Sequence, residues 1–518
     1  MLWPELLGQA WAALAVDADD DVPFPARLEV TGDPGQLPAR LPVEDTAIAC
    51  AGAALLAAAG FARHGADRGS RPARLDRGHV AAAFRSEAYL RLNGQPVATG
   101  FAPLSRFWPA ADGWVRTHAN YPWHRAALLR ALGTADDPAA VAMAIARLAA
   151  REVENLVVGS GGVAAAVRTE TDWRAEPPGQ AVDAARLVEG TRIGDARPRP
   201  RAQGALPASG LRVLDLTRVI AGPVATRYLA ALGADVLRLD PPDRPELTLH
   251  GYDGLPGKRS ALLDLGTAEG NSRWHDLLSG ADVLVHGYRP HALERFGLAP
   301  DTLAERHPGL VVVSLSAWGS RGPWGGRRGF DSIVQAACGI AMAESADGER
   351  PGAMPCQLLD HGTGYLCAAA ALRALDTQAS HGGTQFRELA LARTANWLLG
   401  GAQEAGQARA GAARTGGEAG SWLTTLDSAR GPVTMVLPPG ELDGHGFTWP
   451  SALSRYGSDP ATWSQPLRQR SRDLGLSRTG PASGRPGRGR RGSRAASATG
   501  AGPPAPGAAR PWGGRGGP

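Results

Sequence analysis

The sequence predicts an α/β protein whose main domain is built on a parallel sheet. Residues 210–243 run through an apolar segment, a Gly-Pro turn, a helical pattern and a second apolar segment that ends in acids, which is the order strand, turn, helix, strand. The chain has 518 residues and is 43% hydrophobic, so it can bury a large core and form two or more domains. Both observations favour an open α/β sheet with at least one accompanying domain.

The first strand–helix–strand unit also predicts where a ligand binds. The first strand runs through Val213, Gly222-Pro223 break the pattern, and residues 224–232 have the apolar spacing of a helix packed on a sheet. Gly233 ends that helix before the strand at 236–239. Because the turn follows the carboxyl end of a strand in an open sheet, it is expected to face a ligand, although any such unit without a ligand has the same local pattern.

A dinucleotide is disfavoured as that ligand. The turn at 221–226 lacks the Gly-x-Gly-x-x-Gly pattern that lets backbone approach a pyrophosphate. Pro223 also removes one of the amides that would bind phosphate at the start of the helix.

Several separated motifs follow this unit in a fixed order over about 205–400. They are Lys258-Arg259-Ser260, Ala281–Pro290 with Leu293–Leu298, Val312–Ser316 with Gly319 and Gly322-Pro323, Gly329-Phe330-Asp331, and Leu359–Gly364. Together with 210–243 they resemble the family III CoA-transferases, which include formyl-CoA transferase, carnitine CoA-transferases and, as a divergent branch, α-methylacyl-CoA racemase. The resemblance implies a Rossmann-like parallel-sheet catalytic domain, expected at 208–465, and a second smaller α+β domain.

The region before the catalytic part resembles the family's small domain. Residues 112–118, 123–132 and 161–173 carry this likeness, yet in the family that domain normally follows the catalytic half. Residues 1–175 are therefore interpreted as a small-domain-like or degenerate CoA-transferase half, present either through fusion or through an altered domain order; a separate module stays open. Residues 176–207, rich in Pro, Arg and Ala, are expected to be a linker.

A basic tail closes the chain. Residues 466–518 hold eleven arginines and one acid within a net charge of +5 for the whole chain, so the remainder is mildly acidic. The segment offers almost no large aliphatic side chains and is expected to be disordered. A nucleic-acid-binding arm is one interpretation, but such Arg-Gly-Pro-Ala bias is also what a GC-rich gene gives when read out of frame, and we expect no nucleic-acid partner.

The resemblance assigns the chemistry to Asp360. In this family one aspartate takes the acyl group as a mixed anhydride and then accepts CoA as an enzyme thioester, which a carboxylate ionised near neutral pH can do. Residues 362–364 read as a flexible turn into a helix at 365–375. Without the family context, Asp360 would be interpreted as an ordinary helix N-cap.

CoA contacts are carried over position by position. The residues so matched are Val219, Ala221, Lys258, Arg259, Tyr288 and Arg295. Lys258 is the only lysine of the chain and is interpreted as a point charge near the CoA phosphates. The alternative is that its position in this motif is due to chance. Alternatively, Arg259 and Arg295 are solvated charges on the protein surface.

Position 330 separates the branches of the family. The racemase branch has a histidine there as a second base, whereas this chain has Phe330; His361 is expected to be a hydrogen-bonding or core histidine before a second base. Arg218 and Ile220 stand where the formyl-CoA enzyme has His and Gln, which leaves the small-acid substrate open. The leading function is an acyl-CoA:carboxylate CoA-transferase; the alternatives are a non-catalytic CoA-binding or scaffold homologue and, behind it, a racemase-like enzyme.

Further expectations concern partners and location. Four cysteines without Cys-x-x-Cys or zinc-like spacing predict free thiols and no metal site, and no cofactor beyond CoA as a substrate is expected. The N-terminus has acids in place of a basic n-region, so it is not expected to be a signal peptide, and the apolar stretch at 46–62 is expected to be a core helix. The expected partners are an acyl-CoA and a carboxylic acid acceptor, with no membrane, a cytoplasmic location, and a homodimer as one assembly.

Overall fold

The computed structural model describes residues 2–15, 23–62, 72–97, 100–200, 204–404, 419–449 and 452–464. Residues 1–464 form one compact unit. The interpretation of 466–518 as a disordered tail lies outside the described residues.

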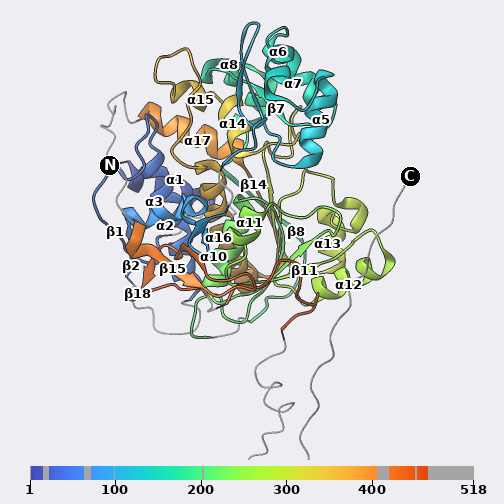
Figure 1. The fold of residues 1–518 in the computed structure, drawn as a ribbon. Coiled ribbons are helices and arrows are strands. Elements are labelled where there is room, and N and C mark those ends of the chain that lie inside the picture. Colours follow the sequence, from blue (N-terminus) through green and yellow to red (C-terminus); the bar gives the residue numbers. More distant parts are fainter. Residues whose placement is uncertain are drawn as a thin grey trace, which may run out of the picture. The chain divides into compact units, whose positions relative to one another are not determined.

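A seven-stranded sheet forms the centre of this unit (Figure 1). In spatial order its strands are β11 (Lys258–Leu262), β10 (Asp235–Asp240), β9 (Arg212–Leu216), β12 (Val283–His286), β13 (Val311–Ser316), β14 (Thr384–Ala390) and β8 (Val188–Gly194). The first six are parallel, and β8 pairs antiparallel to β14. The α/β class with a parallel sheet is therefore confirmed.

Helices cover both faces of the sheet because both faces of its strands are apolar. Val213, Val236, Val283 and Val311 lie in register across four strands and belong to one core, whereas Leu214 and its neighbours on the other face belong to a second core. The first face is covered by α10 (Ala221–Ala231) and α16 (Leu358–His381), the second by α12 (Ala268–Ser279) and α13 (Pro300–Arg306). Strands buried on both faces in this way are typical of parallel sheets.

The strand order places a ligand crevice. The chain passes from β9 outward to β10 and β11 on one side and then returns to β12 on the other side of β9. This reversal leaves an opening at the carboxyl ends of β9 and β12, which is where ligands bind in doubly wound sheets.

The N-terminal elements pack onto the catalytic half. Helix α2 (Val43–Phe61) is long and apolar enough to cross a membrane, but 89% of its apolar window is buried inside the protein, where it packs against α16. The remaining elements of this part are α1 (Trp3–Ala13), α3 (Arg77–Ala83), α4 (Ser86–Tyr89), β1 (Leu28–Thr31), β2 (Ala73–Asp76), β3 (Arg91–Leu92) and β4 (Gln95–Pro96). The expected core helix at 46–62 is therefore present.

Two small sheets join these N-terminal strands to the end of the described chain. One has the order β1-β2-β17-β18 and the other β15-β16-β3-β4. Their late strands are β15 (Leu423–Leu426), β16 (Val433–Val436), β17 (Glu441–Leu442) and β18 (His445–Gly446), preceded by the 3-10 helix η2 (Ala419–Trp422). The expected boundary between 1–175 and 208–465 is thus crossed by β-pairing, and these ranges are not independent units.

The smaller α+β part lies between these segments. Its antiparallel sheet has the order β5 (Phe107–Ala110), β6 (Gly113–Thr117), β7 (Ala164–Ala166). Its helices are α5 (Pro122–Leu132), α6 (Pro138–Ile145), α7 (Ala150–Gly159), α8 (Glu170–Ala175) and α9 (Pro177–Asp183). Figure 1 shows α5, α6 and α7 gathered beside β7.

The interpretation of 176–207 as a linker is wrong. Residues 177–183 form α9, and 188–194 form β8 at the edge of the central sheet. Edge strands tolerate charged residues such as Glu189 and Arg192, so a segment rich in Pro, Arg and Ala can still supply one. The remaining elements are α11 (Thr248–Asp253), η1 (Glu294–Phe296), α14 (Asp331–Ala337), α15 (Ile340–Ala343) and α17 (Leu391–Glu404).

Candidate functional site

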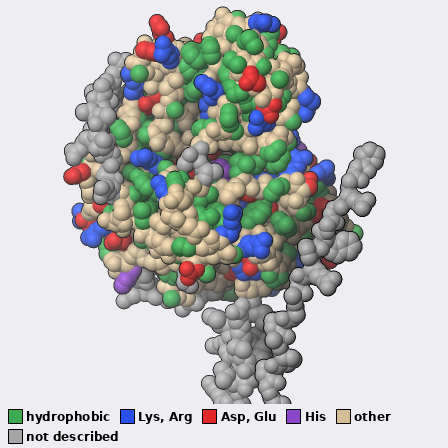
Figure 2. Space-filling model, viewed as in Figure 1, with side chains coloured by type: hydrophobic (Ala, Val, Ile, Leu, Met, Phe, Trp, Pro, Cys, Tyr) green, Lys and Arg blue, Asp and Glu red, His purple; other side chains and the backbone are tan. Residues whose placement is uncertain are grey.

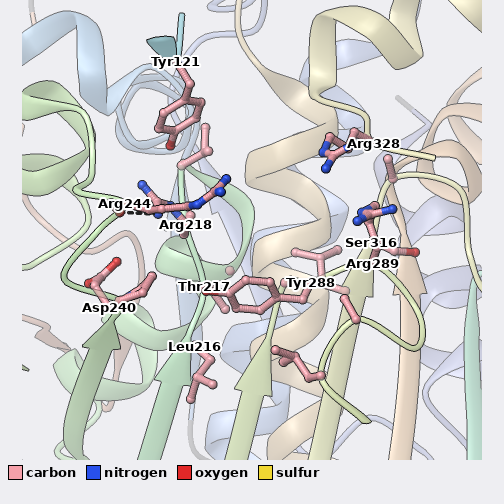
Figure 3. A pocket seen from close by; sticks show the side chains of 18 of the residues that line it. Tyr121, Leu216, Thr217, Arg218, Asp240, Arg244, Tyr288, Arg289, Ser316 and Arg328 are labelled. Carbon is pink, nitrogen blue, oxygen red and sulfur yellow. Dashed lines mark hydrogen bonds between the residues drawn. The ribbon is translucent and has the colours of Figure 1, made fainter. Parts of the chain in front are cut away.

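A cavity of about 890 Å³ opens at the carboxyl ends of β9, β10, β12 and β13, as the strand order requires. This volume is within the range of small-molecule and cofactor sites. Figure 3 shows the strands running toward it, with Arg218 and Arg244 on one side and Arg289 and Arg328 on the other. Of the sequence-predicted site residues, Val219, Ala221, Tyr288, Arg295 and Asp360 line it.

The loop after β9 is held in a strained conformation. Val219 has a positive φ of 68°, which is unfavourable for a β-branched side chain. Its N–H donates to Glu246 Oε2 at 3.0 Å. Strain of this kind persists only where the surroundings fix the backbone, as in ligand sites, and Ala221 follows as the first residue of α10.

Glu246 is the anchor of that loop, and sequence reasoning missed it. Its side chain is buried and pairs with Arg238 at 3.0 Å and Arg218 at 3.6 Å, and it accepts a hydrogen bond from Tyr121 Oη. Burial alone would raise its pKa, but the two guanidinium groups lower it to about 2. The charged Glu246 thus holds Arg218 and Val219, from the loop after β9, together with Tyr121, from the small α+β part, at one wall of the cavity.

Lys258 does not line the cavity, so its predicted phosphate contact is corrected. Its side chain is fully buried, and Nζ donates to Asp215 Oδ2 at 2.8 Å, Thr226 Oγ1 at 2.6 Å and the Pro223 carbonyl at 3.1 Å. All three N–H groups of the ammonium are therefore used beneath the sheet-to-helix turn. Burial lowers its pKa to about 8 against the opposing effect of Asp215.

Arg259 is also placed elsewhere. It pairs with Asp235 at 2.9 Å and donates to the Thr462 carbonyl at 2.5 Å. These contacts tie the edge strand β11 to the last described segment. The sequence pattern could not reveal either outcome, because a basic pair at the start of a strand reads the same whether it faces a ligand or the protein.

Tyr288 and Arg295 line the cavity together with two arginines that the sequence analysis did not single out. Arg289 donates to the Gly326 carbonyl at 3.0 Å, and Arg295 lies 4.6 Å over the Phe296 ring. Among the described residues, no carboxylate lies within ion-pair distance of Arg289, Arg295 or Arg328. Burial, and to a smaller extent the neighbouring Arg289 and Arg244, lowers the pKa of Arg328. This side of the cavity therefore carries positive charge that no nearby carboxylate neutralises among the described residues.

Asp360 lines the cavity from the first turn of α16, which begins at Leu358. The expected flexible turn at 362–364 is therefore wrong, because these residues continue the helix. Asp360 is 6% exposed. Burial, with Asp331 and Glu87 adding to it, holds the pKa of its carboxyl well above the usual range. The helix N-terminus favours its anion.

Asp331 is a second buried carboxyl of the site. Its Oδ2 accepts the N–H of Asp360 at 3.0 Å and its Oδ1 accepts from Gln335 at 2.5 Å. Burial raises its pKa to about 6 in spite of these hydrogen bonds. Asp331 thus holds the start of α16 in place and adds negative charge beside Asp360.

His361 faces away from the cavity, as expected for a hydrogen-bonding histidine. Its side chain is fully buried and Nε2 lies 3.1 Å from Glu87 Oε2, and its ring packs on Phe84. Burial would raise the pKa of Glu87, but His361 lowers it. The N-terminal helix α4 thereby supports the residue next to Asp360.

Phe330 lines the cavity at the position that separates the branches. It stacks on His118 with ring centres 3.8 Å apart. Within the described ranges, no group of three or more His, Cys, Asp or Glu side chains is arranged to hold a metal ion, and the four cysteines are buried free thiols. On the face shown in Figure 2, basic and acidic side chains are interspersed.

Comparison with known proteins adds an independent observation. Residues 208–426 match the model of CoA-transferase family III. The chain is 35% identical over 189 residues to a protein of Mycobacterium tuberculosis named "Probable fatty acyl-CoA transferase Rv3272", covering 34% of this chain and 48% of that protein. It is 30% identical over 203 residues to the succinate–glutarate CoA-transferase of Agrobacterium fabrum, covering 36% and 51%.

A crystal structure of Rv3272 shares 32% identity, with a TM-score of 0.37 over 39% of this chain and 58% of that chain. The chain thus spans about half the length, or less, of these curated relatives.

Proposed function

Because residues 208–426 match the model of CoA-transferase family III, we propose that this protein is an acyl-CoA:carboxylate CoA-transferase with Asp360 as its nucleophile. One observation carries the proposal: the aspartate that the family motif marks lines a cavity large enough for a CoA thioester. The names of relatives that act on succinyl-CoA, malate and glutarate support CoA transfer in general.

The proposed reaction exchanges thioester and anhydride bonds without water. The Asp360 carboxylate attacks the thioester carbonyl of the donor, forming a mixed anhydride and releasing CoA thiolate. The thiolate attacks the Asp360 carbonyl, releasing the donor acid and leaving an aspartyl-CoA thioester. The acceptor carboxylate then attacks that thioester, forming a second mixed anhydride with Asp360 and releasing CoA thiolate. The thiolate attacks the acceptor's acyl carbonyl and displaces the Asp360 carboxylate, so that a new acyl-CoA and free Asp360 result.

The surroundings of Asp360 suit both halves of this cycle. Burial and the neighbouring carboxyls hold its pKa high, which makes its carboxylate more basic than an exposed one and therefore a better nucleophile. The positive end of the α16 dipole favours the Asp360 anion and a developing oxyanion. The Asp360 backbone N–H donates a hydrogen bond to the Asp331 carboxylate, which fixes the backbone orientation of the nucleophile.

We assign CoA to the strand-end part of the cavity. The nucleotide lies against Tyr288, and its phosphates contact Arg289, Arg295 and Arg328, which have no carboxylate partners among the described residues. Cations without counter-charges bind phosphates most favourably, since no internal pair has to be broken. The backbone at Val219 and Ala221 borders this path toward Asp360.

The competing function is a CoA-binding homologue without catalysis, suggested by the placement of the small α+β part before the catalytic half. An isotope-exchange experiment separates the two. An acyl-CoA is incubated with a ¹³C-labelled acid, and labelled acyl-CoA is followed by mass spectrometry for the wild type and for Asp360→Asn. Exchange in the wild type alone supports the proposal; CoA binding without exchange for any acid of a broad panel contradicts it.

A further inference from the structure

One wall of the cavity carries a cluster of four aromatic rings, over two of which Arg218 and Arg244 lie. Tyr121, Trp123 and His124, at the start of α5, line it together with Phe330. Tyr121 and Trp123 stack with centres 4.6 Å apart and planes at 17°, and His124 meets Phe330 at 5.7 Å and 64°. Behind Phe330 lies His118, 3.8 Å away and nearly parallel at 15°.

This aromatic wall adjoins the nucleophile. Phe330 immediately precedes Asp331 in sequence, and the Asp331 carboxylate accepts the N–H of Asp360 at 3.0 Å. Figure 3 shows Tyr121 well separated from Tyr288 and Leu216, which lie near the strand ends. The rings therefore belong to the part of the cavity that receives the acyl group, beyond the end assigned to the CoA nucleotide.

The histidines of the wall behave as neutral rings. Burial lowers the pKa of His124 to about 4, and the nearby Arg328, Arg244 and Arg218 add to this effect. Burial also lowers the pKa of His118 well below its usual range. At neutral pH both are uncharged imidazoles. The Nδ1 atoms of both have no hydrogen-bond partner among the described residues.

The exposure of the rings indicates what would cover them. Phe330 stacks closely on His118 and more distantly on Tyr121, at 6.4 Å, and is still partly exposed. Trp123 is also partly exposed, with Arg218 and Arg244 over its ring. A planar ring entering beside Phe330 would gain an offset-stacked or edge-on contact, which contributes more than the burial of the same apolar area by a saturated chain.

We infer that the acyl group exchanged by this enzyme is an aromatic one, carried by an arylalkyl or aryl carboxylic acid whose ring packs against Phe330 and His124. This inference rests on the proposed function and names its substrate class. A flexible fatty acyl chain would gain burial without stacking. The second carboxylate of a dicarboxylate would pair with Arg218, Arg244 or Arg328 and would leave the Phe330 ring uncovered.

The test compares phenylacetyl-CoA with cyclohexylacetyl-CoA, which match in size and differ in aromaticity, and with succinyl-CoA. The wild type is expected to favour phenylacetyl-CoA over cyclohexylacetyl-CoA by roughly two- to tenfold in kcat/KM, the size of an aromatic pair. Phe330→Leu keeps the wall apolar and should bring this ratio close to one. The matched control is Phe296→Leu, in an aromatic that lines the cavity beside Arg295; it should change KM for both thioesters together and leave the ratio as in the wild type.

The outcomes separate this inference from the proposed function. A wild-type ratio of one or less, a ratio unchanged by Phe330→Leu, or a preference for succinyl-CoA overturns the aromatic substrate class while CoA transfer itself stands. If none of the three thioesters is exchanged by protein that still binds CoA, the proposed function fails and the inference fails with it.

Discussion

Replacing Lys258 by methionine should unfold the protein more easily and should not act through CoA binding. The lysine and Asp215 have fully buried side chains 2.8 Å apart, and methionine keeps the length of the side chain while removing its charge. Asp215 would then be left buried without its main counter-ion. Breaking a buried pair in this way costs about 3–5 kcal/mol in the free energy of unfolding.

Urea unfolding at neutral pH measures that loss, with Arg259→Met as the matched control. Arg259 pairs with Asp235, but these side chains are 23% and 26% exposed, so solvent screens the pair and its loss should cost below about 1 kcal/mol. The double variant Lys258→Met with Asp215→Leu removes both charges and should recover much of the stability. A Lys258→Met protein with wild-type stability and weakened CoA affinity would refute the buried-pair reasoning and restore the phosphate contact.

Three further predictions follow from the site. Asp331→Asn removes a negative charge beside Asp360, so the pKa of Asp360 should fall and the acidic limb of the kcat/KM–pH profile should move to lower pH; a limb that stays in place would show that the two carboxyls do not interact. Arg295→Ala and Arg328→Ala should each lower the affinity for CoA about tenfold at low salt, measured by calorimetry, because the contacts are charge-assisted. At high salt the loss of affinity should be smaller, because salt screens these contacts. Truncation at residue 464 should leave the melting temperature and CoA affinity unchanged, since 1–464 form one compact unit; a melting temperature lowered by several degrees would show that 466–518 stabilise the fold.

The parallel-sheet class could be predicted because each strand carries its own apolar signal. Val213, Val236, Val283 and Val311 lie in register in one core, and such β-branched runs separated by helices specify the sheet without knowledge of tertiary contacts. Asp360 could be predicted only through the family motif, because its local sequence is that of a helix start.

The rest depends on contacts between distant segments. Residues 188–194 join the sheet only through pairing with β14, and nothing in their own composition signals an edge strand. Glu246 and Tyr121 meet at Val219 from segments more than one hundred residues apart along the chain. A motif match marked Lys258 as basic, but only its buried contacts with Asp215 define its role.

The central claim is that Asp360 carries the CoA group covalently, and peptide mass spectrometry tests it most directly. The protein is mixed with an acyl-CoA in the absence of an acceptor acid, quenched in acid and digested. The account predicts a mass increase equal to CoA less one water on the peptide that contains Asp360, and no such increase in Asp360→Asn. An adduct on another residue, or exchange between acids by Asp360→Asn within about tenfold of the wild-type rate, roughly 1.4 kcal/mol in barrier, would contradict the account.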